Sequence, residues 1–320
     1  MADNRLVDEE NIAYHYCSLQ DLLNIIFSKS VWLTSLSSTN DKKELSYGRK
    51  QLQEMIQEMM VNDDYLEIRS LLQKIIEEID KRSYRNYFSA KAYYGASFVG
   101  NRDSLVHWER YGNKLRGVCV AINFGMLERY FKDLGLPEFC TTWLWHNQVI
   151  YQEDEQKKYI EEYLTNKISS LSADNGFYDL SFSYAAIYYE TLAVIRPLFK
   201  HTGFGDECEY RLIFEEKQAE LDCKYYIDVS NSEKSKRTSR CINKAIEGLN
   251  LRTGDKKYGL FDNGIRSYYD MSLCKFWDDR LIPEIIIGPH CRQSTKELKA
   301  FLRANGLNKT DVSVSQIPIR

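Results

Sequence analysis

HTGFGDECEYRLIFEE, residues 201–216, joins a glycine turn to a strand-like run. Two glycines flank Phe204 and predict the turn. Beyond the turn, side chains two positions apart share a face of a strand. One parity is apolar and consists of Tyr210, Leu212 and Phe214. The other parity carries two carboxylates and a guanidinium, those of Glu207, Glu209 and Arg211. This arrangement can hold a charged group over a cleft, and an edge strand with a solvated charged face gives the same pattern.

Upstream of this stretch, residues 13–34 predict a strand, a helix and a second strand. The first strand carries His15, and Ser18 is a good N-cap for the apolar-periodic helix that follows. The second strand, VWLTSL, leads into a polar loop that contains Asn40 and Asp41. For His15, a hydrogen-bonded structural histidine is the alternative to a role in a site.

Residues 92–124 have strand character on both sides of a polar segment. AYYGASFVG, which contains Ser97, predicts one strand, and VCVAINF is almost free of charge and predicts a central one. Between these strands, Trp108 and Tyr111 lie about one helical turn apart. This aromatic pair can stack on a flat ring or cap the core.

The sequence as a whole predicts one α+β domain over residues 1–320. Residues 46–90 have apolar positions at three- and four-residue steps with charges between them, which predicts a helical insertion or lid. GDKKYGLFDNG, residues 254–264, predicts a turn-rich loop. Short strands and long helices fill the rest, and 43% hydrophobic residues allow a substantial core.

The charge balance excludes some classes of partner. The formal net charge is -3, from 43 basic and 46 acidic residues, and it gives no argument for general nucleic-acid or membrane binding. A local basic groove stays open at Lys234–Arg240, with Lys256 and Lys257. No apolar run is long enough to cross a bilayer.

Cysteine and histidine spacing gives no support for a metal site. The eight cysteines include no C-x-x-C pair, and the histidines other than His15 are isolated in the sequence, so no metal is expected. The first residues lack an apolar signal region. We therefore expect a reduced, cytoplasmic protein with mostly buried thiols.

Five segments, in this order, resemble a widespread bacterial domain family of unknown function. They are Tyr14–Ser18, Trp32–Glu44, Ser97–Phe98 with Trp108 and Tyr111, Glu207–Arg211, and Glu284–Pro289. The resemblance covers most of the chain but not residues 46–90. It departs from the family pattern at Cys17, Val99 and Tyr210, where threonine, serine and tryptophan are common.

That family is distantly similar to the ADP-ribosyltransferase fold, which holds NAD in a cleft between two small sheets. The similarity implies two small mixed or antiparallel sheets around a cleft, with long flanking helices. Enzymes of this fold have a histidine or arginine on the first strand, an aromatic residue or serine on a middle strand, and a late glutamate. His15, the Ser97–Tyr111 region and Glu209 occur in that order here.

The resemblance also implies roles for individual residues. Cleavage of the nicotinamide–ribose bond passes through an oxocarbenium-like state, which a carboxylate stabilises. Glu209 would hydrogen-bond the ribose, Glu207 would orient or deprotonate an acceptor, and Arg211 would bind a pyrophosphate or neutralise the glutamates. The residues expected to bind NAD are His15, Tyr16, Asn40, Asp41, Ser97, Trp108, Tyr111 and Arg211.

The expected function is therefore that of an NAD-using ADP-ribosyltransferase or NAD glycohydrolase. By resemblance, it would act as a bacterial effector in toxin activity or phage defence, on a macromolecular acceptor or on water. A non-enzymatic module that binds a nucleotide or nucleic acid is the alternative. A nuclease-type hydrolase is a third reading, weakened by the lack of a metal-binding pattern.

Overall fold

The computed structural model describes most of the chain and divides it into two compact units. The described ranges are 11–38, 44–79, 92–135, 143–173, 180–216, 233–261 and 264–318. The first unit takes the described residues within 36–93 and 149–205. The second unit takes those within 4–35, 94–148 and 206–320.

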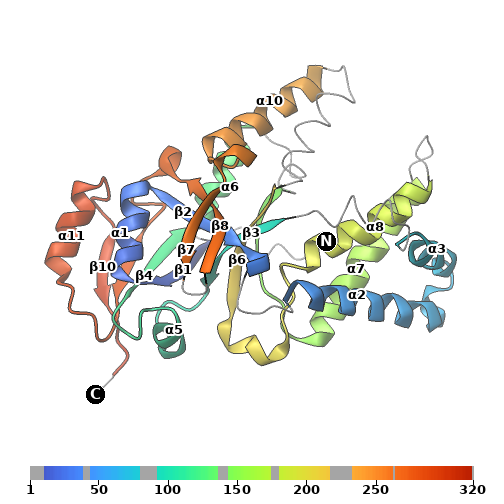
Figure 1. The fold of residues 1–320 in the computed structure, drawn as a ribbon, viewed down its shortest axis with the longest axis horizontal. Helices are drawn as coiled ribbons and strands as arrows, with labels where there is room; N and C mark the ends of the chain where they lie inside the picture. The colour runs from blue at the N-terminus through green and yellow to red at the C-terminus, as the bar shows by residue number, and fades with distance from the viewer. Residues whose placement is uncertain are drawn as a thin grey trace. The chain divides into compact units, whose positions relative to one another are not determined.

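One mixed sheet dominates the second unit (Figure 1). Its strands are β1 (Ile12–Cys17), β2 (Ser30–Ser35), β3 (Tyr93–Val99), β4 (Val118–Asn123), β5 (Leu144–Gln148), β6 (Glu209–Glu215), β7 (Lys257–Phe261), β8 (Gly264–Ser272), β9 (Glu284–Ile287) and β10 (Asp311–Val314). They follow the order β10-β9-β4-β1-β3-β2-β8-β7, and β6 joins β3 and carries β5 on its other side. β9 and β10 are parallel, whereas β1 is antiparallel to both β3 and β4.

The predicted α+β class is confirmed, but the described strands form one sheet in place of the two expected. The reason lies in β3, which pairs with more than one neighbour. Val99 at its end is opposite Tyr14 of β1, and Gly95 nearer its start is opposite Thr34 of β2. Because β6 also pairs with β3, the sheet branches at this strand.

The first strand–helix–strand segment forms as its sequence predicts. Ser18 caps α1 (Leu19–Ser28), because its hydroxyl accepts from the Asp21 amide while the Asp21 carboxylate accepts from the Ser18 amide. The helix buries Leu22 and Ile26. It ends at Lys29, whose φ of 50° is left-handed, and β2 begins at the next residue.

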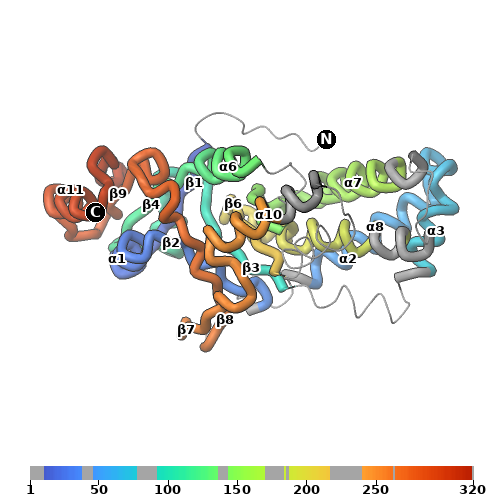
Figure 2. The backbone as a smooth tube through the Cα atoms, turned by 90° about the horizontal axis from the view of Figure 1, so that it is seen from above, coloured from blue at the N-terminus to red at the C-terminus, as the bar shows by residue number. Residues whose placement is uncertain are grey.

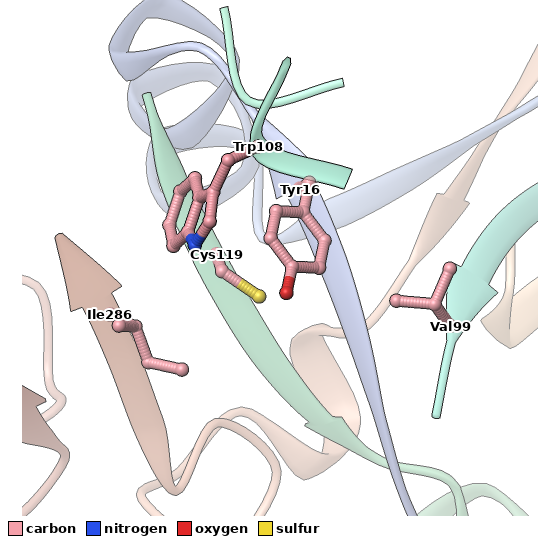
Figure 3. Packing of buried hydrophobic residues seen from close by; sticks show 5 residues of the cluster. All are labelled: Tyr16, Val99, Trp108, Cys119 and Ile286. Carbon is pink, nitrogen blue, oxygen red and sulfur yellow. The ribbon is translucent and has the colours of Figure 1, made fainter. Parts of the chain in front are cut away.

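The strand β4 lies between β1 and β9 and is buried along almost its whole length, as predicted from its lack of charge. A cluster of buried side chains packs around it. Figure 3 shows the Trp108 indole beside the Tyr16 phenol and the Cys119 thiol, with Ile286 on β9 and Val99 on β3. Besides α1, the described α-helices of this unit are α5 (Leu105–Arg110), α6 (Phe124–Asp133), α10 (Glu233–Gly248) and α11 (Thr295–Ala304).

The strand β6 does not fit the alternative of an edge strand with a solvated face, because both of its faces are buried. β3 and β5 flank it, so neither edge meets solvent along the paired length. The prediction that Glu207 shares the strand face is wrong, because the strand begins at Glu209. Glu207 ends a 3-10 helix, Thr202–Glu207, and Cys208 follows with a left-handed φ of 43°. Glu207 therefore lies outside the strand face that Glu209 and Arg211 share.

The turn-rich loop predicted for residues 254–264 is wrong over most of its length. Lys257–Phe261 form β7, which pairs with β8 as the outermost strand of the sheet (Figure 2). Packing across strands explains the difference. The Tyr268 ring of β8 lies 6.2 Å from the Phe261 ring and 4.5 Å from the Trp32 ring, and these are tertiary contacts that local sequence does not reveal.

The described part of the first unit contains four α-helices: α2 (Glu44–Val61), α3 (Arg69–Ile79), α7 (Glu153–Ala173) and α8 (Leu180–Ile195). α2 packs on the other three, and α8 packs on α3 and α7 (Figure 2). The helices predicted within 46–90 are confirmed as far as Ile79, and residues 80–90 lie outside the described part. A lid function for them stays a prediction.

A buried glutamine holds this helical unit together. The Gln156 amide of α7 donates to the carbonyl oxygens of Ile150, at 2.7 Å, and Lys200, at 2.9 Å. Its own oxygen accepts from the hydroxyl of Tyr47 on α2, at 3.1 Å. One buried side chain thus ties two helices to the segments on both sides of the α7–α8 pair. Within the described ranges, no helix is both long and apolar enough to cross a membrane.

Candidate functional site

The centre of the candidate site is an ion pair on β6. Glu209 and Arg211 lie two residues apart on one face of the strand, as predicted. The Arg211 guanidinium donates from Nε to Glu209 Oε1, at 2.7 Å, and from Nη2 to Oε2, at 2.9 Å. The two side chains are only 6% and 2% exposed, in the order Glu209 and Arg211. This two-point contact fixes the carboxylate in one orientation.

Two predicted residues from neighbouring strands extend the pair. The hydroxyl of Ser97 on β3 donates to Glu209 Oε1. The backbone oxygen of Ser97 accepts from Nδ1 of His15 on β1, at 3.0 Å. His15, Ser97, Glu209 and Arg211 therefore form one hydrogen-bonded chain across three strands. Ser97 is exposed, so this chain reaches the surface of the unit.

The contacts of His15 define its hydrogen positions and its charge. A carbonyl oxygen only accepts, so Nδ1 carries the hydrogen in the bond to Ser97. Burial lowers the pKa of His15, although the Ser97 carbonyl opposes that shift. The ring lies 5.5 Å from the Phe98 ring. His15 is thus a neutral hydrogen-bond donor, and the pairing of β1 with β3 holds it in place.

Glu207 and Tyr111 form a second, more exposed pair in the same unit. The Tyr111 hydroxyl donates to Glu207 Oε1, at 3.0 Å, and the Tyr111 side chain is 44% exposed. Burial and the charge of Glu207 raise the pKa of Tyr111, and the charge of Glu209 adds to this shift. The two pairs are therefore within electrostatic reach of each other.

His107 connects the aromatic helix to this second pair. Its Nε2 donates to the Glu207 backbone oxygen, at 2.9 Å, and its ring is stacked with that of Tyr111 at 6.3 Å. His107 is buried, and its other ring nitrogen, Nδ1, has no hydrogen-bond partner among the described residues. The sequence alone presents this histidine as an isolated residue, because both contacts join segments far apart in the chain.

Trp108 does not take the predicted place beside nicotinamide. It is fully buried in the core, where its indole nitrogen donates to Asp103 Oδ1 at 2.6 Å and its ring lies 4.7 Å from that of Tyr16. A side chain without exposed surface cannot flank a ligand. The alternative role, capping the core, is the one that the structure supports for Trp108, whereas Tyr111 keeps an exposed ring.

Two other predicted ligand contacts are also contradicted by burial and pairing. The Tyr16 hydroxyl donates to the Asn101 backbone oxygen, at 2.9 Å, and accepts from the Ser104 amide, at 3.0 Å, so it is occupied in the core. Arg211 is occupied by Glu209 and does not present its guanidinium for a pyrophosphate. Asn40 and Asp41 lie outside the described residues.

An arginine that the sequence did not single out offers a replacement cation. Arg110 ends α5 next to Tyr111, and it is exposed. Its charge lowers the pKa of Tyr111, which places it within electrostatic reach of the phenol. An exposed guanidinium in this position can bind a phosphate without breaking the buried ion pair.

The predicted basic groove finds no support in the described contacts. Lys256 forms an ion pair with Glu216, and Lys257 forms one with Asp270, at 3.1 Å. The run Lys234–Arg240 opens α10, where the side chains up to residue 239 are outside the description. In the described part of the chain, no three histidine, cysteine or acidic side chains gather as a metal site would require.

Comparison with known proteins finds a family model that matches about a third of the chain. Residues 107–212 match the family model described as "Protein of unknown function (DUF2971)". This confirms the expected resemblance to a family of unknown function. The matched range contains Trp108, Tyr111 and the Glu207–Arg211 segment. No curated protein and no solved structure matches the chain. The similarity to the ADP-ribosyltransferase fold stays a prediction.

Proposed function

We propose that the group formed by His15, Ser97, Glu207, Glu209 and Tyr111 binds NAD, and that the protein cleaves the bond between nicotinamide and ribose. The ADP-ribose then passes to a macromolecular acceptor or to water. The observation that carries this proposal is the convergence of these predicted residues. They come from β1, β3, the residue after α5, and β6 with the 3-10 helix before it. Hydrogen bonds or a common charge interaction join them.

The residues of this site can bind NAD, but with roles that differ from the predicted ones. Tyr111 offers an exposed ring for a flat base, and the neighbouring Arg110 offers an exposed guanidinium for the pyrophosphate. Glu207 is half-buried and has one oxygen on the Tyr111 hydroxyl, so it is the carboxylate that can approach a ribose. Glu209 is buried and acts through position and charge.

The proposed reaction uses these carboxylates to stabilise positive charge. When the C–N bond breaks, its electron pair leaves with nicotinamide, and the ribose becomes oxocarbenium-like. A fixed carboxylate stabilises that state more than the ground state. The oxygen of the acceptor or of water then bonds to the ribose carbon, and its proton passes to Glu207. A role in toxin activity or phage defence rests on the family resemblance alone.

A second candidate is a module that binds a nucleotide without chemistry. One observation favours it: both oxygens of Glu209 already accept hydrogen bonds from Arg211, and Oε1 also accepts from Ser97. A carboxylate held in this way serves packing as well as it serves catalysis. The two candidates differ in one product, which is free nicotinamide.

The test is incubation of the purified chain with NAD, with free nicotinamide as the readout. We expect the wild type to release nicotinamide, and Glu207→Gln to lower the rate by about 100-fold or more, the scale for a lost transition-state contact. Glu109→Gln is the matched control, because Glu109 is exposed on the same helix as Trp108. Release by Glu207→Gln at the wild-type rate would contradict the proposal. Stabilisation by NAD without release would favour the binding module.

A further inference from the structure

The second unit contains an open pocket that none of the residues above line. Its volume is about 890 Å³, within the usual range for small-molecule sites. Three separate segments form its wall: the start of α1, the turn after α5 and the loop after β9. The described lining residues are Leu19, Arg116, His290, Cys291, Arg292 and Gln293.

The turn that presents Arg116 has an unusual backbone. Asn113, Lys114 and Leu115 have φ values of 49°, 52° and 71°, so three consecutive residues with side chains are left-handed. Two hydrogen bonds close the turn, from the Leu115 amide to the Trp108 carbonyl at 3.0 Å and from the Gly117 amide to the Gly112 carbonyl at 2.8 Å. Such a conformation persists only where the surrounding structure fixes it.

The loop after β9 fixes that turn through direct backbone contacts. The Gly288 amide donates to the Gly117 carbonyl, at 3.0 Å, and the His290 amide donates to the Leu115 carbonyl, at 2.9 Å. The two segments are so close that a Cβ atom on Gly288 would lie 2.8 Å from the carbonyl oxygens of both Gly117 and Leu115. The segments that carry Arg116 and Arg292 are thus held against each other as one rigid wall.

The side chains that line this wall are either positively charged or neutral. Two guanidiniums, an imidazole and an amide face an apolar contact from Leu19, and none of the described lining residues has a carboxylate. Arg116 and Arg292 are exposed. The positive end of α1 adds to this field at Leu19, its first residue, although the Asp21 carboxylate in its capping box offsets part of it. Guanidiniums match phosphate oxygens with paired hydrogen bonds.

We infer that this pocket binds the phosphate group of a nucleotide-sized ligand, with Arg116 and Arg292 as the contacts that determine affinity. The inference goes beyond the proposed function and does not rest on it, because the pocket shares no residue with the group around Glu209. The volume accommodates more than a bare phosphate, and Leu19 gives an apolar surface for the rest of the ligand.

The experiment titrates ADP, which has no nicotinamide bond to cleave, into the wild type and four variants by calorimetry. We expect Arg116→Gln and Arg292→Gln each to weaken binding about tenfold, the effect of one lost charged hydrogen bond. The double variant should lose binding. Arg303→Gln is the matched control, because Arg303 is an exposed arginine on α11 outside the pocket, and it should bind as the wild type does. Melting temperatures establish that every variant is folded.

Inorganic phosphate and a 5′-phosphorylated single-stranded oligonucleotide distinguish the source of the phosphate. Tighter binding of ADP than of either indicates a free nucleotide. Tighter binding of the oligonucleotide, with steep salt dependence, indicates a nucleic-acid end. Both results support the inference if the double variant abolishes them.

Two outcomes overturn the inference. One is equal affinity of the double variant and the wild type for the ligand that binds. The other is failure of the wild type to bind any of the three probes at millimolar concentration. Loss of ADP binding in Glu207→Gln, but not in the double variant, would assign ADP to the group around Glu209. That result would overturn the pocket and leave the proposed function standing.

Discussion

Arg211 and Glu209 face each other on one strand, and the guanidinium donates to both carboxylate oxygens at 2.7 and 2.9 Å. The alternation of a β-strand places them on the same face, and both side chains are almost completely removed from solvent. Burial makes each charge dependent on the other. The pair therefore holds the Ser97 contact and the start of β6 in a fixed position.

Removal of one partner of this pair should destabilise the second unit strongly. We expect Arg211→Met to lower the free energy of unfolding by about 3–5 kcal/mol, because the Glu209 charge is left buried without its partner. Urea denaturation followed by circular dichroism measures this. The double variant Arg211→Met/Glu209→Gln should recover part of the loss. A decrease below about 1 kcal/mol for Arg211→Met would mean that the pair is not buried as described.

The contact between β1 and the Gly112–Gly117 turn should not tolerate a side chain. A Cβ atom on Gly117 would lie 2.1 Å from the Cys17 carbonyl oxygen. We expect Gly117→Ala to lower the free energy of unfolding by about 2 kcal/mol or more, as overpacking does. Gly100→Ala is the control, since a Cβ atom there would meet no atom within 4 Å, and its effect should stay within about 0.5 kcal/mol. Equal effects of the two substitutions would refute the close approach.

Asp103 should contribute stability that depends on pH. Burial alone would raise its pKa, but hydrogen bonds from Trp108, Gln316 and Ser315 outweigh burial and lower the pKa below its ordinary value. A carboxylate with a lowered folded-state pKa stabilises the fold above its ordinary pKa of about 4, and this contribution is lost as the pH falls through the folded-state value.

We therefore expect Asp103→Asn to be less stable than the wild type at neutral pH by about 1.5–3 kcal/mol, the scale of a hydrogen bond to a charged group. The difference should shrink as the pH falls below about 4. Urea denaturation of both proteins at a series of pH values measures it. A difference that stays constant across the acidic range would show that the Asp103 charge contributes nothing.

The exposed ring of Tyr111 should matter more to ligand binding than its hydroxyl. If the ring stacks on a base, Tyr111→Ala should weaken NAD binding about tenfold, whereas Tyr111→Phe keeps the ring and should weaken it less. Calorimetric titration with NAD compares the two variants. The fold should be little affected, because the side chain is 44% exposed. A larger loss for Tyr111→Phe than for Tyr111→Ala would exclude stacking.

The sequence predicted the features that depend on neighbours along the chain. Ser18 as a helix cap, the buried strand around Val120, and the shared face of Glu209 and Arg211 all follow from local spacing. The family resemblance assigned His15 and Ser97 to one site but did not predict the hydrogen bond between them, which joins strands that are distant in sequence.

Some residues lie elsewhere than the sequence predicted, because tertiary contacts that no local pattern reveals determine their positions. Trp108 is buried because Asp103 satisfies its indole nitrogen. Glu207 leaves the strand face because Cys208 turns left-handed before β6 begins. The pocket at Arg116 escaped prediction because its wall combines three segments far apart in the chain. Tertiary backbone contacts at Gly288 and His290 hold two of them together.

The most direct test of the central claim is amide hydrogen exchange with and without NAD, followed by mass spectrometry of peptides. The account predicts slower exchange in peptides that cover residues 95–99, 107–112 and 207–211, with α7 unchanged as an internal reference. It also predicts that Glu207→Gln reduces this protection while Glu109→Gln does not. Unchanged exchange in all three peptides at saturating NAD, or protection confined to other parts of the chain, would contradict the claim that this group is the NAD site.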